Sequence, residues 1–312
     1  MIEEAPLLED IADGPPGGRA VWVEARDGVR LRVAHWPADA GRGTILLFPG
    51  RTEFIEKYGR AARDLGARGY GTLVIDWRGQ GLSDRLTGDT ATGHVGSFDD
   101  YQADVAGMIG AGKALGAPGP WHLLAHSMGG AIGLRAALKG LPVVSCAFSA
   151  PMWGIRLRAA LRPLAWSIGW ASRHVGLGHR YAPSTGPESY VLTAPFETND
   201  LTRDAQMHRH MRAQLTAHPE LSLGGPSLHW LFAALQECRR LHALPSPDLP
   251  CLTLLGTDER IVDTGRIEGR MARWPGAQLV RIEGALHEPM MDTPETREAL
   301  WDRLNHFWQA ST

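Results

Sequence analysis

A short apolar run that ends abruptly in small residues is the feature that most constrains this chain. Residues 123–130 read LLAHSMGG, and a stretch with helical spacing, residues 131–139, follows directly. A strand, a sharp turn and a helix in this order form a nucleophile elbow, because small neighbours let the backbone turn tightly and expose the serine oxygen. The pattern predicts that Ser127 is a nucleophile; the alternative is that its hydroxyl caps the following helix.

Apolar strand patterns alternate with helical patterns along most of the chain. Strand patterns cover residues 44–48, 71–76, 121–125, 143–148, 250–255 and 278–282. Helical spacing covers residues 54–66, 98–115, 131–139, 227–241 and 294–308. Strands that are apolar on both faces and are separated by helices form a parallel sheet covered on both sides. We therefore predict an α/β fold with a doubly wound, mostly parallel sheet.

Two segments depart from this alternation. Residues 1–18 are acidic and then rich in proline and glycine, which predicts a loose arm, and residues 20–36 alternate around Asp27 and Gly28, which predicts a hairpin. Residues 152–226 contain no apolar strand pattern but several short helical stretches. We expect residues 1–151 and 227–312 to form the core and residues 152–226 to form an inserted helical cap, or lid.

Helical spacing within the expected cap separates two stripes of side chains. The apolar stripe comprises Leu157, Leu161, Leu164, Ile168, Ala171 and Val175. The opposite stripe comprises Arg158, Arg162, Trp166, Trp170 and Arg173. Aromatic and cationic groups facing outward are typical of a helix at a membrane interface, and an ordinary solvated face is the alternative. Pro163 argues against one continuous helix.

Composition excludes several classes of function. The formal charge is −2, with 32 Lys and Arg against 34 Asp and Glu, so the chain as a whole offers no electrostatic footprint for nucleic acid. The three cysteines are far apart in the sequence and predict neither a disulfide framework nor a zinc site. Because no apolar run approaches membrane-spanning length and the first residues lack a secretory signal pattern, we expect a cytoplasmic protein.

The base and the acid that a nucleophilic serine needs have candidates near the end of the chain. A base must take the hydroxyl proton, and a third group must orient that base. His287 follows the last predicted strand, at the carboxyl end where open α/β sheets place their ligand sites. The preceding strand ends in residues 256–263 (GTDERIVD), which offer Asp258, Glu259 and Asp263. Asp263 has the alternative interpretation of a helix cap.

Further motifs occur in a fixed order along the chain. They are residues 49–53 (PGRTE) with Lys57 and Tyr58, residues 76–83 (DWRGQGLS), residues 93–95 (GHV) with Phe98 and Tyr101, and the elbow with Met128. Together with the order serine, acid, histidine, these motifs resemble the α/β-hydrolases and, within that fold, the bacterial lysophospholipase and monoacylglycerol lipase group. The resemblance covers nearly the whole chain outside residues 152–226. It departs at Ala125, where the group usually has glycine.

The resemblance implies a function and a site. It implies a serine hydrolase that cleaves carboxylic esters of acylated lipids, either lysophospholipid or monoacylglycerol, through an acyl-enzyme on Ser127. The spacing in the group selects Glu259 as the acid, and a shift of one residue in the turn would select Asp258 instead. In this fold the backbone N–H groups of Arg51 and Met128 would form the oxyanion hole. The Arg51 side chain is either a phosphate ligand for a lipid head group or a solvated loop arginine.

The expected partners follow from this chemistry. Serine, base and oxyanion donors suffice for ester hydrolysis, so no metal or organic cofactor is expected. We expect a small-molecule acyl ester as substrate, peripheral contact of the cap with the inner membrane face, and no nucleic acid. The alternatives are an esterase or aminopeptidase for small soluble substrates, and a non-catalytic binding protein on the hydrolase scaffold.

Overall fold

The computed structural model describes residues 3–156 and 162–311, in which strands and helices alternate as the sequence predicts. The strands are β1 (Glu3–Ala5), β2 (Arg19–Glu24), β3 (Arg30–Trp36), β4 (Thr44–Phe48), β5 (Gly71–Asp76), β6 (Trp121–His126), β7 (Ser145–Ser149), β8 (Cys251–Gly256) and β9 (Gln278–Ile282). The helices are α1 (Glu9–Ala12), α2 (Gly59–Ala67), α3 (Tyr101–Ala114), α4 (Ser127–Leu138), α5 (Arg162–His174), α6 (Tyr190–Thr193), α7 (Ala205–Ala217), α8 (Leu228–Ala243), α9 (Thr264–Met271) and α10 (Pro294–Gln309).

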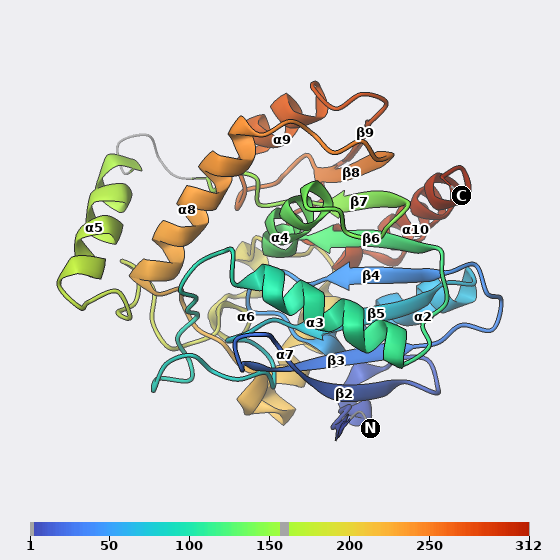
Figure 1. The fold of residues 1–312 in the computed structure, drawn as a ribbon, viewed down its shortest axis with the longest axis horizontal. Helices are drawn as coiled ribbons and strands as arrows, with labels where there is room; N and C mark the ends of the chain where they lie inside the picture. Colours follow the sequence, from blue (N-terminus) through green and yellow to red (C-terminus); the bar gives the residue numbers. More distant parts are fainter. Residues whose placement is uncertain (1–2, 157–161, 312) are drawn as a thin grey trace.

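The nine strands of the described residues form one sheet, in the order β1-β2-β3-β5-β4-β6-β7-β8-β9. Figure 1 shows β2 to β9 of this sheet. The pairs β1–β2, β2–β3 and β3–β5 are antiparallel, and every pair from β5 through β9 is parallel. Successive side chains of a strand point to opposite faces. Accordingly, Leu46 and Phe48 belong to one core cluster and Ile45 and Leu47 to the other. The doubly wound, mostly parallel α/β fold is confirmed.

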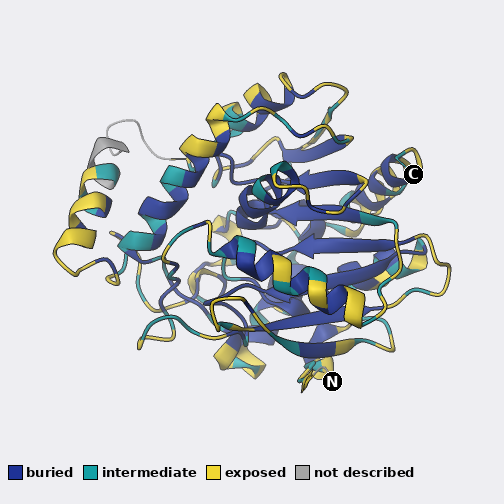
Figure 2. Cartoon of the chain, in the orientation of Figure 1, coloured by how far each residue is buried: buried dark blue, intermediate teal, exposed yellow. Residues whose placement is uncertain are grey.

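The helices cover both faces of the sheet, and the central strands β4 to β8 are buried along almost their whole length (Figure 2). Residues of α3 and α4 pack in the core cluster that contains Leu46, whereas residues of α2 and α10 pack in the cluster that contains Leu47. The chain order reverses direction at β4, since β5 lies on one side of it and β6 on the other. In open α/β sheets the crevice at such a switch point is where ligands bind.

The amino-terminal segment is not the loose arm that its composition predicts. Residues 3–5 form an edge strand on β2, and α1 places Ile11 and Ala12 in the core cluster on the Leu47 side. The Ile11 carbonyl also accepts a hydrogen bond from Gln214 of α7, at 2.8 Å. The prediction was wrong because strand pairing and packing against α7 order a segment whose local sequence favours no regular structure.

The stripes predicted in the inserted segment are only partly right where they can be compared, since Trp170 and Arg173 are exposed as expected but other members are not placed as predicted. Residues 157–161 and the side chains of Arg162 and Leu164 lie outside the described residues, and Pro163 is the second residue of α5, where proline is tolerated. Trp166 packs edge to face on Phe232 of α8, with ring centroids 5.4 Å apart, and the Arg173 guanidinium lies over the same ring. Ala171 and Val175, expected to face inward, are exposed.

Gly169 determines which face of α5 packs against α8. A Cβ at Gly169 would lie 2.7 Å from the Phe232 side chain, so the closest approach of α5 to α8 is along the face that contains Gly169. Trp166 and Ser172 lie three residues to either side of Gly169 and share this face. Hydrophobic periodicity alone misses such a contact, because it depends on an absent side chain.

Candidate active site

The turn from β6 into α4 places Ser127 in a conformation that few side chains adopt. Its backbone φ is +48°, in the left-handed region. The residues after it must be small: a Cβ at Gly129 would lie 2.2 Å from the Phe48 carbonyl oxygen, and one at Gly130 would lie 2.5 Å from the Pro151 side chain. This close packing of α4 against the ends of β4 and β7 holds the Ser127 side chain at the carboxyl edge of the sheet.

Ser127 and His287 lie within hydrogen-bonding distance of each other. The distance from Ser127 Oγ to His287 Nε2 is 2.9 Å, and that from His287 Nδ1 to Glu259 Oε2 is 2.7 Å. All three side chains are buried. Ser127 is therefore not the cap of α4: the N-cap residue is His126, and the Ser127 hydroxyl contacts the His287 imidazole instead. The structure brings together the serine, the base and the favoured acid that the sequence predicts.

The two other carboxylates of the turn after β8 lie elsewhere. Asp258 is exposed, and Asp263 is the N-cap of α9, where its side chain accepts a hydrogen bond from the Arg266 amide at 3.2 Å. Glu259 Oε1 accepts hydrogen bonds from the backbone amides of Ile261 and Val262, at 2.6 and 3.1 Å. Burial raises the pKa of Glu259, but the His287 contact and these amides outweigh burial, so its pKa lies below the usual value. The carboxylate is thus ionised at neutral pH.

The loop after β4 lies beside the elbow because β4 and β6 are neighbouring parallel strands. Phe48 and Ala125 are aligned in register, so the residues that follow them reach the same edge. Thr52 donates its amide to the Gln80 side chain at 3.1 Å, and Gly50 donates its amide to the Glu53 carboxylate. Within the described part of the chain, the amide of Arg51 between them has no hydrogen-bond acceptor.

The amide of Met128 is the second candidate donor at this edge. Met128 is the second residue of α4, and the first amides of a helix lack intrahelical acceptors. The amides of Arg51 and Met128 thus come from the loop after β4 and from the first turn of α4. Donors fixed in this way by the backbone can stabilise negative charge without reorganising.

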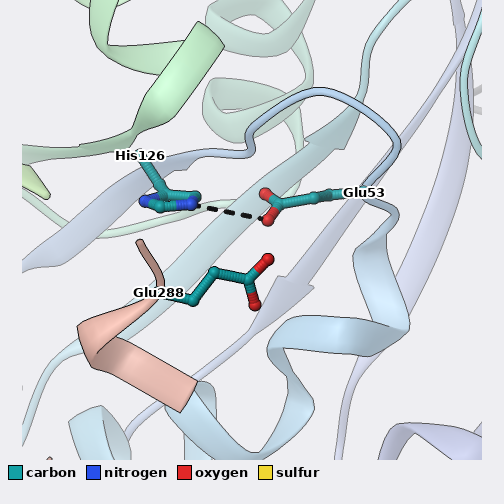
Figure 3. Close-up of side chains that lie close together, drawn as sticks. All are labelled: Glu53, His126 and Glu288. Atoms are coloured by element: carbon teal, nitrogen blue, oxygen red, sulfur yellow. Dashed lines mark ion pairs between the residues drawn. The ribbon is translucent and has the colours of Figure 1, made fainter. Parts of the chain in front are cut away.

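A buried cluster of charges supports the loop after β4, and sequence analysis did not assign it a role. The Lys57 ammonium donates to Glu53 Oε1 at 2.7 Å and to Glu288 Oε1 at 2.8 Å. Figure 3 shows Glu53, His126 and Glu288 converging, with His126 Nε2 3.7 Å from Glu53 Oε1. The sequence contains one signal of this cluster, the spacing of Glu53 and Lys57, which are four residues apart. The third member, Glu288, directly follows His287 in the sequence.

In this cluster one ammonium serves two carboxylates. Burial raises the pKa of Glu53, but the Lys57 ammonium and further contacts lower it to about 2. Burial lowers the pKa of Lys57, but Glu288 and Glu53 more than compensate, so its pKa lies above the usual value. Glu53, His126 and Glu288 bring potential metal-ligand atoms within 4.8 Å of one another. Lys57 already bridges the two carboxylates, so the cluster is an ion-pair network that holds its own cation.

A cavity of about 300 Å³ opens beside Ser127. Its polar wall contains Ser127, His287, Lys57 and Glu288, whereas residues 152–226 and α8 provide much of the apolar wall. The apolar side chains include Met152, Val191, Leu201, Met211, Leu215 and Trp230. The site therefore combines a nucleophile and polar groups at one end with an apolar enclosure.

The fold and the site define a class of protein. A doubly wound sheet with a serine on a strand–turn–helix elbow, and with an acid and a histidine on later loops, is the arrangement of an α/β-hydrolase. A family profile described as serine aminopeptidase, S33, matches residues 39–294. The chain belongs to this family of α/β-hydrolases.

Two similar proteins carry lysophospholipase names. The chain is 33% identical over 296 residues to lysophospholipase L2 of Escherichia coli (strain K12). This alignment covers 90% of this chain and 85% of that protein. The chain is 30% identical over 290 residues to a probable lysophospholipase L2 of Haemophilus influenzae, spanning 92% of this chain and 90% of that protein.

Solved structures share the fold at lower identity. A soluble variant of monoglyceride lipase from Saccharomyces cerevisiae, in complex with a substrate analog, superposes with a TM-score of 0.71 at 21% identity, over 93% of this chain and 94% of that one. A carboxyl esterase from Bacillus coagulans, in complex with glycerol, gives a TM-score of 0.74 at 14% identity, over 95% and 99%. Among the helices that the structure describes, none has the length and apolar character needed to span a bilayer.

Proposed function

We propose that the chain hydrolyses the carboxylic ester of a single-acyl lipid, a lysophospholipid or a monoacylglycerol, through an acyl-enzyme on Ser127. The observation that carries this proposal is the row of hydrogen bonds from Ser127 through His287 to Glu259 at the wall of a largely apolar cavity. The similarity to lysophospholipase L2 along most of both chains supports a lipid ester as substrate.

The proposed reaction has two halves. His287 Nε2 takes the Ser127 proton as Oγ attacks the ester carbonyl carbon, while Glu259 holds the proton on Nδ1 and stabilises the imidazolium. The amides of Arg51 and Met128 donate to the oxyanion. As the tetrahedral intermediate collapses, the leaving alcohol takes the proton from His287. Water then attacks the acyl-enzyme, His287 takes a proton from the water, and Ser127 Oγ regains a proton as the fatty acid leaves.

Residues 152–226 act in this proposal as the cap of the site. They supply apolar side chains that would enclose an acyl chain, which is removed from water at about 0.8 kcal/mol per CH₂ group. The end of α5 also exposes Trp170, Val175 and Leu177 next to the exposed Arg173. We therefore place the membrane contact of the cap at these side chains, with the enzyme in the cytoplasm and its substrate drawn from the inner membrane face.

The decisive experiment compares Ser127→Ala with the wild type. We expect the variant to keep its circular dichroism spectrum, to lose labelling by a fluorophosphonate, and to lose hydrolysis of lysophospholipid and monoacylglycerol down to the residual left by oxyanion donors, about 10³- to 10⁴-fold over water. Appreciable turnover by purified Ser127→Ala would refute the nucleophile. A wild type that fails to react with the probe would favour a binding protein on this scaffold.

A substrate panel separates the remaining alternatives. The family description names an aminopeptidase, so aminoacyl anilides belong in the panel together with p-nitrophenyl esters of increasing acyl length. An enclosed apolar cavity predicts that kcat/KM rises with acyl length, because each added methylene is buried. Highest activity on aminoacyl anilides or on acetate esters would instead identify an aminopeptidase or a small-substrate esterase.

A further inference from the structure

The side chain of Arg51 is not a solvated loop arginine. It extends from the loop after β4 to the inserted segment, where Nη2 donates to the Gly224 carbonyl oxygen at 2.5 Å. The guanidinium carbon lies 5.4 Å from the ring centroid of Trp230. Its Nε is buried and has no hydrogen-bond partner in the part of the chain that the structure describes. One donor of this guanidinium is thus left without an acceptor.

Arg51 also lacks the carboxylates that accompany three of the buried cations of this protein. Arg32 pairs with Glu56 and Asp76, Arg78 with Asp27 and Asp104, and Lys57 with Glu53 and Glu288. A fourth, Arg270, has no carboxylate either, but its guanidinium donates to the carbonyl oxygens of Pro245, Leu241 and Leu244. Arg51 makes no ion pair with any described residue. Burial lowers the pKa of Arg51 to about 10, so the guanidinium still carries its charge at neutral pH. Arg51 is partly buried, and a charge withdrawn from water without a counter-charge is costly, so a bound anion would lower that cost.

The position of Arg51 connects two cavities. Its side chain lines the cavity that contains Ser127 and also a second cavity of about 380 Å³. The second cavity is formed largely by the inserted segment, and its lining residues include Ser184, Thr185 and Glu188. A ligand whose ester lies at Ser127 could therefore place a polar head group in the second cavity, past the Arg51 guanidinium.

Resting on the proposed function, we propose that the Arg51 guanidinium binds the phosphodiester of a lysophospholipid head group and thereby makes the enzyme prefer lysophospholipid to monoacylglycerol. In a lysophospholipid only the glycerol carbons separate the phosphate from the acyl ester. In the proposed reaction the Arg51 amide faces the ester carbonyl, so the phosphate would lie within reach of the Arg51 side chain. Guanidinium donors match phosphate oxygens in geometry and charge. A monoacylglycerol has a neutral hydroxyl at that position and leaves Arg51 without its counter-charge.

Gly93 provides the space for this guanidinium and offers an independent variant. A Cβ at Gly93 would lie 3.1 Å from Arg51 Nη2 and 3.4 Å from Nε. Because φ at Gly93 is not positive, alanine fits the backbone there, and the added methyl group would displace the guanidinium. Gly93→Ala thus perturbs the proposed head-group contact without altering the Arg51 side chain or its charge.

The test compares the ratio of kcat/KM for 1-octanoyl lysophosphatidylethanolamine to that for 1-octanoylglycerol, both kept below their micelle concentrations. We expect Arg51→Gln to lower this ratio by about 10- to 100-fold, the size of a lost hydrogen bond to a charged group. Arg51→Lys should retain part of the preference for the lysophospholipid, and Gly93→Ala should lower the ratio, as Arg51→Gln does. Arg209→Gln, the same charge change on the exposed surface of α7, should leave it unchanged.

Two water-soluble inhibitors identify the source of the anion. Glycerophosphoethanolamine should compete with substrate in the wild type and at least about ten-fold more weakly in Arg51→Gln. Inorganic phosphate that competes as strongly as this diester would assign Arg51 to a free anion and overturn the head-group assignment.

The outcomes separate this inference from the proposed function. Equal loss of kcat/KM on both substrates in Arg51→Gln, with an unchanged ratio in Gly93→Ala, would mean that the side chain only supports the loop, and the inference would be wrong. A wild type that hydrolyses monoacylglycerol but no lysophospholipid would overturn the inference and leave the lipid ester hydrolase standing. Hydrolysis of neither substrate would overturn the proposed function itself.

Discussion

At the scale of single residues, the turn after β8 determines which of two adjacent carboxylates contacts His287. The Asp258 amide donates to the Ala285 carbonyl at 3.1 Å, which ties this residue to the loop before His287. A Cβ at Gly256 would lie 2.1 Å from the same carbonyl oxygen, so only glycine allows β8 to end this close to that loop. With the backbone of Asp258 held there, its side chain points to solvent and that of Glu259 points inward.

We predict that Glu259→Gln lowers kcat by orders of magnitude. The amide would favour the wrong tautomer of His287 and would not stabilise the imidazolium, an effect of roughly 10⁴ when an aspartate is replaced in this way in a serine protease. Steady-state kinetics on p-nitrophenyl butyrate measure the loss. Asp258→Asn is the matched control, because it makes the same chemical change at the exposed neighbour and should cost much less. A greater loss in Asp258→Asn would move the acid to Asp258.

At the scale of elements, the loop between β4 and α2 is held by charge as much as by packing. Lys57 lies in its short 3₁₀ helix (Ile55–Tyr58), with two carboxylates and little exposure to water. Glu53 in turn accepts from the Gly50 amide and from the Tyr58 hydroxyl. The backbone that carries the Arg51 amide is thus anchored through Glu53 to a buried ion-pair network.

We predict that Lys57→Met destabilises the protein by about 3–5 kcal/mol, because it leaves two carboxylates buried without their cation. The free energy of unfolding in urea measures this cost. Lys139→Met is the control: its ammonium lies on the surface, 3.6 Å from Asp99, where an ion pair contributes about 0–1 kcal/mol. A loss at Lys57 no larger than that at Lys139 would show that the cluster does not hold the loop.

Elements differ in how far their sequence predicts them. The strands from β4 to β8 bury both faces, so their apolar runs predict a parallel sheet. The positions of Ser127, Glu259 and His287 after successive strands could be predicted from the same pattern. The Lys57 network could not be predicted, because Glu288 joins it from 231 residues away. The face of α5 was missed for a related reason: the contact at Gly169 depends on the shape of α8 rather than on hydrophobic periodicity.

At the scale of the whole molecule, exposed large apolar side chains gather at one place on the insert. Trp170 is 59% exposed, Val175 65% and Leu177 47%. All three lie at the end of α5 or just after it, with Arg173 and Arg180 exposed beside them. Apolar side chains flanked by cations suit the boundary between the head groups and acyl chains of an anionic bilayer.

We predict that changing Trp170, Val175 and Leu177 together to serine lowers hydrolysis of lysophospholipid in anionic vesicles by about ten-fold or more, because each side chain would otherwise bury apolar area in the bilayer. Vesicle binding of the wild type should weaken at high salt, since each nearby arginine contributes about 1 kcal/mol of screened attraction. Co-sedimentation with vesicles and a paired assay on soluble p-nitrophenyl butyrate measure both effects.

The control for this prediction is Val144→Ser, which removes an exposed apolar side chain from the loop before β7, at the other edge of the sheet. It should change neither vesicle binding nor turnover of the soluble ester. An equal loss on vesicles and on p-nitrophenyl butyrate in the triple variant would identify the α5 surface as ordinary cap packing.

The adjacency of β4 and β6 positions the Arg51 loop beside the Ser127 elbow independently of the insert. Hydrogen bonds between these strands set the spacing of the Arg51 loop and the Ser127 elbow, and the insert takes no part in them. The loop that carries His287 is tied to the insert as well, because the amides of His287 and Glu288 donate to the carbonyl oxygens of Asp200 and Leu201, at 3.2 and 2.9 Å. Arg51 is another place where the two parts meet, because its amide belongs to the loop after β4 and its side chain is tied to Gly224 of the insert. A lineage that changes its preferred lipid would leave its mark first at this residue.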